Sequence, residues 1–119
     1  MSRLLPSGLL LSGALCAMVL AASPAAHAED PPVFSLVLKD HKFEPAELRV
    51  PANTRFQIKV RNADPTVAEI ESLELKVERV ITGGRETTLR LGPLAAGRYP
   101  FMDEFNSETA QGMLIVEAK

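Results

Sequence analysis

Five side chains of this sequence are candidates to bind one metal cation. They are two glutamates spaced two residues apart, two adjacent late acidic residues and one histidine: Glu69, Glu71, Asp103, Glu104 and His41. Carboxylate oxygens with at most one imidazole suit Fe(II), Fe(III) or Mn(II), and more weakly Cu(II). Two carboxylates on one face repel each other unless a cation or hydrogen bonds offset their charge. The residue types therefore indicate a hard-cation site, provided that the fold brings these distant segments together.

The start of the chain has the composition of a secretory signal peptide. Arg3 supplies a basic beginning, residues 9–22 are almost entirely apolar, and Ala26-His27-Ala28 has the small-x-small pattern of a cleavage site. The apolar stretch is shorter than the roughly 20 residues that a membrane span needs. We therefore predict a signal peptide over residues 1–28, removed before Glu29, and a periplasmic protein. An uncleaved membrane anchor is the alternative.

Cleavage at this point leaves one small domain, residues 29–119, which is 91 of the 119 residues. Cys16 and His27 leave with the signal peptide, so the domain has no cysteine for a disulfide and His41 is its single histidine. The loss of Arg3 leaves 12 basic and 15 acidic side chains, a net charge of −3. This mild acidity argues against nucleic acid as a partner.

Apolar residues in the domain recur with period two, which is the period of a β-strand. In residues 55–60, for example, Phe56, Ile58 and Val60 share one face. Turn-forming residues separate such runs, so about seven to eight short strands are expected in a β-sandwich or small barrel. The predicted strands are residues 33–38, 46–50, 55–60, 67–72, 75–81, 87–91, 98–102 and 112–117.

Two local points need the structure to decide them. Residues 71–80 could be helical, because Leu73, Val77 and Val80 would share a helical face. The β-branched residues in the second half of this stretch favour a strand there. Gly83-Gly84 then follows between two strand-like runs, which predicts a tight hairpin.

Three segments of the domain resemble the cupredoxin family. They are HKFEPAELRVPANTRFQIKVRNAD (41–64), LGPLAAGRYPF (91–101) and GMLIVE (112–117). Members of that family typically show F-x-P-x-x-x-x-V, an alternating strand ending in Asn-x-Asp, then L-x-P-G-x-Y-x-F, a metal loop and a final G-x-L-x-V strand. No single motif is specific, but their order covers essentially the whole domain. The resemblance implies an all-β, cupredoxin-like Greek-key sandwich.

The resemblance also implies where the blue-copper ligands of the family would lie. That site uses two histidines, one cysteine thiolate and often a weak axial methionine. Asp103 stands at the cysteine position, the first histidine position falls near Ala68 or Glu69, and the second falls in residues 106–108, which contain no histidine. A thiolate-ligated blue-copper site is therefore excluded in this domain.

The same resemblance brings the candidate ligands to one end of the sandwich. The segments around residues 69 and 103 converge at the ligand end of a cupredoxin, and His41 precedes a turn at or near that end. If residues 67–72 are extended, their two glutamates point to the same face. The residues predicted to hold an iron or copper ion are Glu69, Glu71, Asp103 and His41, with Glu104 as a flanking carboxylate.

A narrower likeness is to the cupredoxin-like domains of bacterial periplasmic iron-uptake systems. It is carried by the E-x-E of residues 69–71, by VERVI (77–81) and by AQGMLIVE (110–117). Such domains accompany a high-affinity iron permease and are proposed to bind copper or iron. Some members carry cysteines where this chain has Lys42 and Asp103, so thiolate capture of copper does not carry over.

These features predict a periplasmic metal-binding accessory of bacterial iron uptake with a carboxylate-rich, non-blue site. Its expected partners are the metal ion, a membrane iron permease and other periplasmic iron-uptake components. A ferroxidase-like activity is left open, although an isolated ion would still need an electron acceptor. The alternative is a metal-free sandwich that serves as a structural or protein-interaction module in a membrane transport complex.

Overall fold

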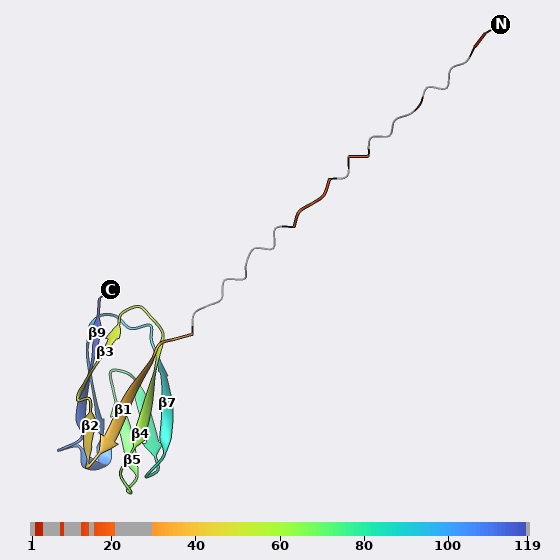
Figure 1. Ribbon diagram of the computed structural model, residues 1–119. Helices are drawn as coiled ribbons and strands as arrows, with labels where there is room; N and C mark the ends of the chain where they lie inside the picture. Colours follow the sequence, from red (N-terminus) through yellow and green to blue (C-terminus); the bar gives the residue numbers. More distant parts are fainter. Residues whose placement is uncertain (1, 4–7, 9–12, 15, 21–29, 119) are drawn as a thin grey trace.

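The computed structural model describes residues 2–3, 8, 13–14, 16–20 and 30–118 (Figure 1). Nine strands and one short 3-10 helix lie between Val33 and Glu117. The predicted cleavage site lies outside the described residues, so the signal peptide and the domain boundary stay predictions. In the part of the chain that is described, no helix is long and apolar enough to cross a membrane.

A four-stranded sheet forms one layer of the sandwich. β1 lies at its centre, antiparallel to β2 and parallel to β4, and β7 is antiparallel to β4. The order across the sheet is β2 (Lys42–Glu44), β1 (Val33–Lys39), β4 (Phe56–Asn62) and β7 (Glu86–Leu91). The sequence did not predict β2, a strand of three residues that is too short to show a period.

A five-stranded sheet forms the other layer. Its last strand in sequence, β9, lies between β3, to which it is parallel, and β8, to which it is antiparallel. The order is β3 (Glu47–Pro51), β9 (Gln111–Glu117), β8 (Gly97–Asp103), β5 (Ala68–Ser72) and β6 (Val77–Ile81). The 3-10 helix η1 (Glu104–Asn106) follows β8 directly. The all-β sandwich is therefore confirmed, and the strand reading of the second half of residues 71–80 is correct.

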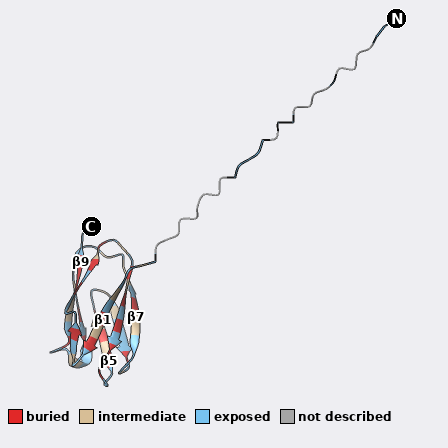
Figure 2. Cartoon of the chain, in the orientation of Figure 1, coloured by how far each residue is buried: buried red, intermediate tan, exposed pale blue. Residues whose placement is uncertain are grey.

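The core lies between the two sheets and follows the alternation in the sequence (Figure 2). Phe56, Ile58 and Val60 of β4 are buried, whereas the residues between them are half-buried or exposed. Phe43 and Phe101 join the two layers through an edge-to-face contact with ring centroids 5.0 Å apart. Burial of these apolar faces is the main favourable term that holds the layers together.

Residues 83–84 do not form the predicted hairpin. β6 belongs to the five-stranded sheet and β7 to the four-stranded sheet, so this turn carries the chain from one layer to the other. A Cβ atom on Gly83 would lie 2.2 Å from the carbonyl oxygen of Pro65, and Gly84 has a φ of 74°. Glycine is needed at position 83 because the backbone approaches closely, and at position 84 because the conformation is left-handed. Hairpins and crossovers can both require these features, so the two glycines do not distinguish them.

Candidate functional site

β5 presents its two glutamates on the outer face of the five-stranded sheet. Ala68, Ile70 and Ser72 point into the sandwich and are buried, whereas Glu69 and Glu71 alternate with them and are half-exposed. This is the pleated geometry in which residues two apart share a face. The prediction that the two glutamates lie on one face is confirmed.

A third and a fourth carboxylate approach this pair from neighbouring elements. Glu78 of β6 lies directly opposite Glu71 in the antiparallel ladder. Glu104 is the first residue of η1, which contacts β5. Carboxylate oxygens of Glu69, Glu78 and Glu104 all lie within 4.8 Å of one another. We call these three residues the acidic cluster, and Glu71 lies beside it.

Mutual contact of these carboxylates changes their acidity. A side-chain hydrogen bond with Glu78, desolvation and the charge of Glu104 raise the pKa of Glu69 to about 7. The charge of Glu104, followed by desolvation, raises the pKa of Glu71. Glu69 therefore keeps its proton in slightly acidic solution, because protonation relieves the repulsion between like charges. A bound cation would relieve the same repulsion and displace that proton.

Asp103 lies on the inner side of the same region and has different partners. Its carboxylate is fully buried and accepts hydrogen bonds from the backbone N–H groups of Glu69 at 2.9 Å and Phe105 at 3.1 Å. The side-chain amide of Asn106 donates a third, at 3.1 Å. Asp103 thereby caps η1 and ties the late loop to β5. Its carboxylate is not in the acidic cluster, so a role as a ligand stays a prediction.

His41 lies in the turn between β1 and β2 and contacts a different carboxylate. Its backbone N–H donates to Asp64 Oδ2 at 3.0 Å, and its Nδ1 lies 3.5 Å from the same oxygen. The backbone N–H of Asp40 donates to the other oxygen of Asp64 at 2.7 Å. Both turn residues have positive φ, and Asp64 stabilises that turn. The structure therefore places His41 beside Asp64 and outside the acidic cluster.

Of the five predicted ligands, the structure brings Glu69 and Glu104 into the acidic cluster and places Glu71 next to it. Sequence reasoning missed Glu78, which stands within the VERVI segment but depends on strand register. Glu71 and Glu78 become partners because β5 and β6 are joined by the turn at residues 73–76. Pairing the two predicted strands as a hairpin would have been the signal that places Glu78 there.

A blue-copper centre does not fit these residues. Residues 30–118 contain no cysteine, and their single histidine, His41, is paired with Asp64. The position expected for the thiolate holds Asp103, whose carboxylate already accepts three hydrogen bonds from protein groups. The acidic cluster offers oxygen ligands only, which suit a hard cation.

Comparison with known families agrees with this architecture. The sequence profile of the cupredoxin-like domain matches residues 12–116, which is most of the chain. The chain belongs to the cupredoxin-like family. This cupredoxin-like protein is also 37% identical over 81 residues to an uncharacterised protein of Rickettsia prowazekii (strain Madrid E). The match covers 68% of this chain and 65% of that protein, so the chain spans less than two thirds of that relative.

Solved structures show the same fold in copper proteins. The metal-binding domain of the Cu(I)-exporting P-type ATPase CopA of Streptococcus pneumoniae D39 matches with a TM-score of 0.64 and 20% identity, over 71% of this chain and 84% of that one. Auracyanin A, a blue copper protein of Chloroflexus aurantiacus, matches with a TM-score of 0.59 and 16% identity, over 74% and 100%. At 16–20% sequence identity, these likenesses concern the fold alone.

Proposed function

We propose that this cupredoxin-like protein is a periplasmic metal-binding accessory of bacterial iron uptake that holds an iron or copper ion at a non-blue site. The observation that carries the proposal is the acidic cluster, in which three carboxylates from β5, β6 and η1 meet within 4.8 Å. Two consecutive strands and a helix that follows more than twenty residues later bring like charges together here. Such an arrangement costs stability unless protons or a cation balance it.

The chemistry of the acidic cluster favours a hard, divalent or trivalent ion. Glu69, Glu78 and Glu104 would supply oxygen ligands, with Glu71 close enough to add its charge. Fe(III), Fe(II) and Cu(II) accept such ligands, and Fe(III) gains most from three negative charges. Fold likeness to copper-binding proteins supports copper as the other candidate. The ligands remain carboxylates in either case.

The iron-uptake part of the proposal rests on the sequence. The E-x-E of residues 69–71 and the VERVI segment resemble periplasmic domains that accompany an iron permease, and the predicted signal peptide would deliver the protein to that compartment. Both segments contribute to the acidic cluster, through Glu69 and Glu78. We limit the proposed role to binding and delivery of the ion, because Fe(II) oxidation would also require an electron acceptor.

Calorimetric titration of the purified protein with Fe(II), Fe(III) and Cu(II) tests the proposal. We expect one ion to bind with about micromolar affinity, and Glu69→Gln and Glu104→Gln each to weaken binding at least about tenfold. Glu86→Gln is the matched control, because Glu86 is exposed on β7 in the other sheet. Absence of binding by all three ions, or equal binding by all variants, would refute a metal site at the acidic cluster.

A second candidate function is a metal-free structural or protein-interaction module. The hydrogen bonds of Asp103 favour it, because they fix the late loop to β5 without an ion. In this case the titrations show no binding, and the loop is as ordered in chelator as in metal. Chemical shifts of residues 103–110, measured with and without chelator, separate the two candidates, since a bound ion must perturb Glu104.

A further inference from the structure

A depression of about 280 Å³ lies on the five-stranded sheet where β5 leaves its neighbour β8. The ladder between these strands ends at the pair Glu71 and Met102. Farther along, Pro100 has no N–H to donate, and its carbonyl accepts a hydrogen bond from Ser72 Oγ at 2.7 Å in place of a backbone partner. Gly112 of β9 leaves its side-chain position to the ring of Phe101, and both residues line the depression. The depression is therefore formed by residues of β5, β8 and β9.

The walls of the depression are largely apolar and open to solvent. Leu73 is 81% exposed and Met102 is 37% exposed, and Met113 lines the opposite wall. Methionine side chains are flexible and polarisable, so they adapt to apolar groups of different shape. An engineered apolar cavity of about 150 Å³ holds a benzene molecule, so this larger space has room for one large side chain. Exposed apolar surface of this kind is typical of an interaction site.

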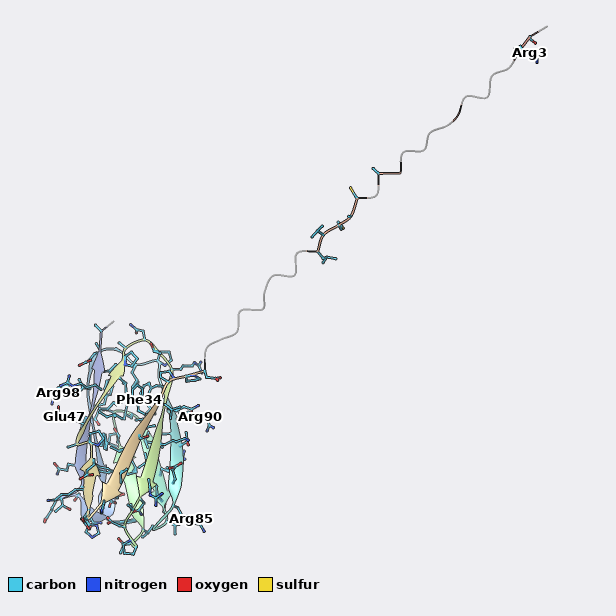
Figure 3. All side chains as sticks on the ribbon, viewed as in Figure 1. Arg3, Phe34, Glu47, Arg85, Arg90 and Arg98 are labelled. Atoms are coloured by element: carbon cyan, nitrogen blue, oxygen red, sulfur yellow. The ribbon has the colours of Figure 1, made fainter. Side chains whose placement is uncertain are left out.

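The rim of the depression carries negative charge and no positive charge. Glu71 and Glu74 line it, and its lining contains no lysine or arginine. The acidic cluster extends the negative charge along the same sheet, since Glu71 lies beside it. Arg98 and Arg49 lie toward β3, where both form ion pairs with Glu47. Figure 3 labels Arg98 and Glu47 at this place. The depression therefore combines an apolar floor with an anionic edge.

We propose that this depression is the docking site for a polypeptide segment of a partner protein, with one large aliphatic side chain inserted and lysine or arginine beside it. Charge complementarity selects this occupant. An anionic lipid surface would be repelled by Glu71 and Glu74. A second copy in a two-fold arrangement would bring the same two glutamates against themselves. The cations of the partner segment lie over the anionic edge, and its aliphatic side chain contacts Leu73 and Met113.

Docking can be tested separately from metal binding. Leu73 and Glu74 line the depression and do not belong to the acidic cluster. The test therefore uses protein in chelator, so that a failure of the metal-binding proposal leaves the result unaffected. The probe is a short synthetic peptide with lysine-leucine-leucine-lysine at its centre. Two matched peptides replace either the lysines by glutamate or the leucines by glycine.

NMR titration of isotope-labelled protein with the three peptides measures both affinity and location. We expect only the lysine-leucine peptide to bind, with shifts concentrated at residues 71–74, 100–102 and 111–113. Leu73→Asp should weaken binding at least about tenfold, as expected for a buried apolar anchor. Val80→Asp is the matched control, because Val80 is exposed on the same sheet but outside the depression. Glu74→Gln should weaken binding less, and Glu86→Gln should not change it.

Several outcomes would overturn the proposal. They are no binding of the lysine-leucine peptide, equal binding of the glutamate peptide, shifts confined to another surface, or unchanged affinity in Leu73→Asp. Two further measurements test the other occupants. Stronger binding to anionic vesicles than to the peptide would assign the surface to a membrane. A concentration-dependent mass that Leu73→Asp abolishes would assign it to a second copy of the chain.

Discussion

Asp103 and Glu69 are neighbours across β5 and β8, yet their carboxylates have opposite surroundings. The carboxylate of Asp103 is buried and faces three N–H donors, one of which is the backbone of Glu69 itself. The carboxylate of Glu69 is half-exposed and faces the carboxylates of Glu78 and Glu104. The backbone N–H of Glu69 thus donates to the carboxylate of Asp103 on the inner side of the sheet. Its side chain faces the carboxylates of Glu78 and Glu104 on the outer side.

This difference separates a structural carboxylate from one available for binding. Hydrogen-bond donors stabilise the negative charge of Asp103, so that charge needs no further partner. Among the described residues, no N–H group donates to the carboxylates of the acidic cluster, and the pKa of Glu69 is raised to about 7. In this chain, hydrogen bonds to Asp103 hold the loop that follows β8, and the carboxylates of the acidic cluster lie on the outer face of the sheet.

The largest expected effect comes from removing the structural carboxylate. Asp103→Ala leaves the N–H groups of Glu69 and Phe105 and the amide of Asn106 without an acceptor, and should lower the free energy of unfolding by about 3–5 kcal/mol. Asp103→Asn keeps one acceptor and should cost less. Urea denaturation measures both, with Glu108→Ala, an exposed change in the same loop, as the control. If Asp103→Ala were as stable as the native protein, the hydrogen bonds of Asp103 would not have the structural role that distinguishes it from the acidic cluster.

Asp64 extends the comparison to a second carboxylate with N–H partners. Its two oxygens accept hydrogen bonds from the backbone of Asp40 and His41. We expect Asp64→Ala to lower the free energy of unfolding by about 2–3 kcal/mol, because two N–H groups in a turn with positive φ lose their acceptor. Hydrogen exchange of these two amides should accelerate in the variant. Unchanged exchange would show that Asp64 does not hold the turn.

The pH dependence of metal affinity tests the role of Glu69 in the acidic cluster. Because the pKa of Glu69 is raised to about 7, an ion that binds the acidic cluster must displace a proton below that pH. The affinity should therefore fall by about tenfold for each pH unit below 7 and level off above it. Titration calorimetry in buffers of different ionisation enthalpy measures the released proton. A pH-independent affinity would place the ion away from Glu69.

The smallest effect is on stability in the absence of metal. The pKa of Glu69 is raised from 4.5 to about 7, so the folded state retains a proton that the unfolded chain has lost between these values. The contribution of Glu69 to stability is complete below about pH 4.5 and is lost as the pH rises through 7. Glu69→Gln should flatten this dependence and be more stable than the native protein at pH 8. Thermal unfolding of both proteins across this pH range measures the difference, with Glu86→Gln as the control. An equal pH dependence in Glu69→Gln and the native protein would contradict the prediction.

The sequence predicted those features that depend on local pattern. Period two gave eight of the strands and placed Glu69 and Glu71 on one face, because alternation along a strand is set by the pleat. The VERVI segment was correctly read as a strand. Asp103 was identified as the residue at the thiolate position, but its donors come from β5 and η1, and a sequence does not show which N–H groups will point toward a side chain.

Features that depend on pairing between strands could not be predicted in the same way. Glu78 joins the acidic cluster through its register with Glu71, which becomes visible only when the two predicted strands are paired as a hairpin. The turn at residues 83–84 was wrongly predicted as a hairpin, because its glycines report close backbone approach but not the sheet to which the next strand belongs. His41 was expected near the ligand end and lies beside Asp64, whose carboxylate accepts hydrogen bonds from a turn more than twenty residues earlier in the chain.

The position of β9 inside its sheet has a consequence for how the chain folds. β9 joins β3 to β8, and residues 47–51 find their partners only in residues 113–117. The five-stranded sheet cannot close until residues 111–117 are available to pair with β3 and β8. Closure then joins segments more than sixty positions apart, which makes a small domain slow to fold for its size. Deletion of β9 would therefore remove an internal strand of the five-stranded sheet and not an edge strand.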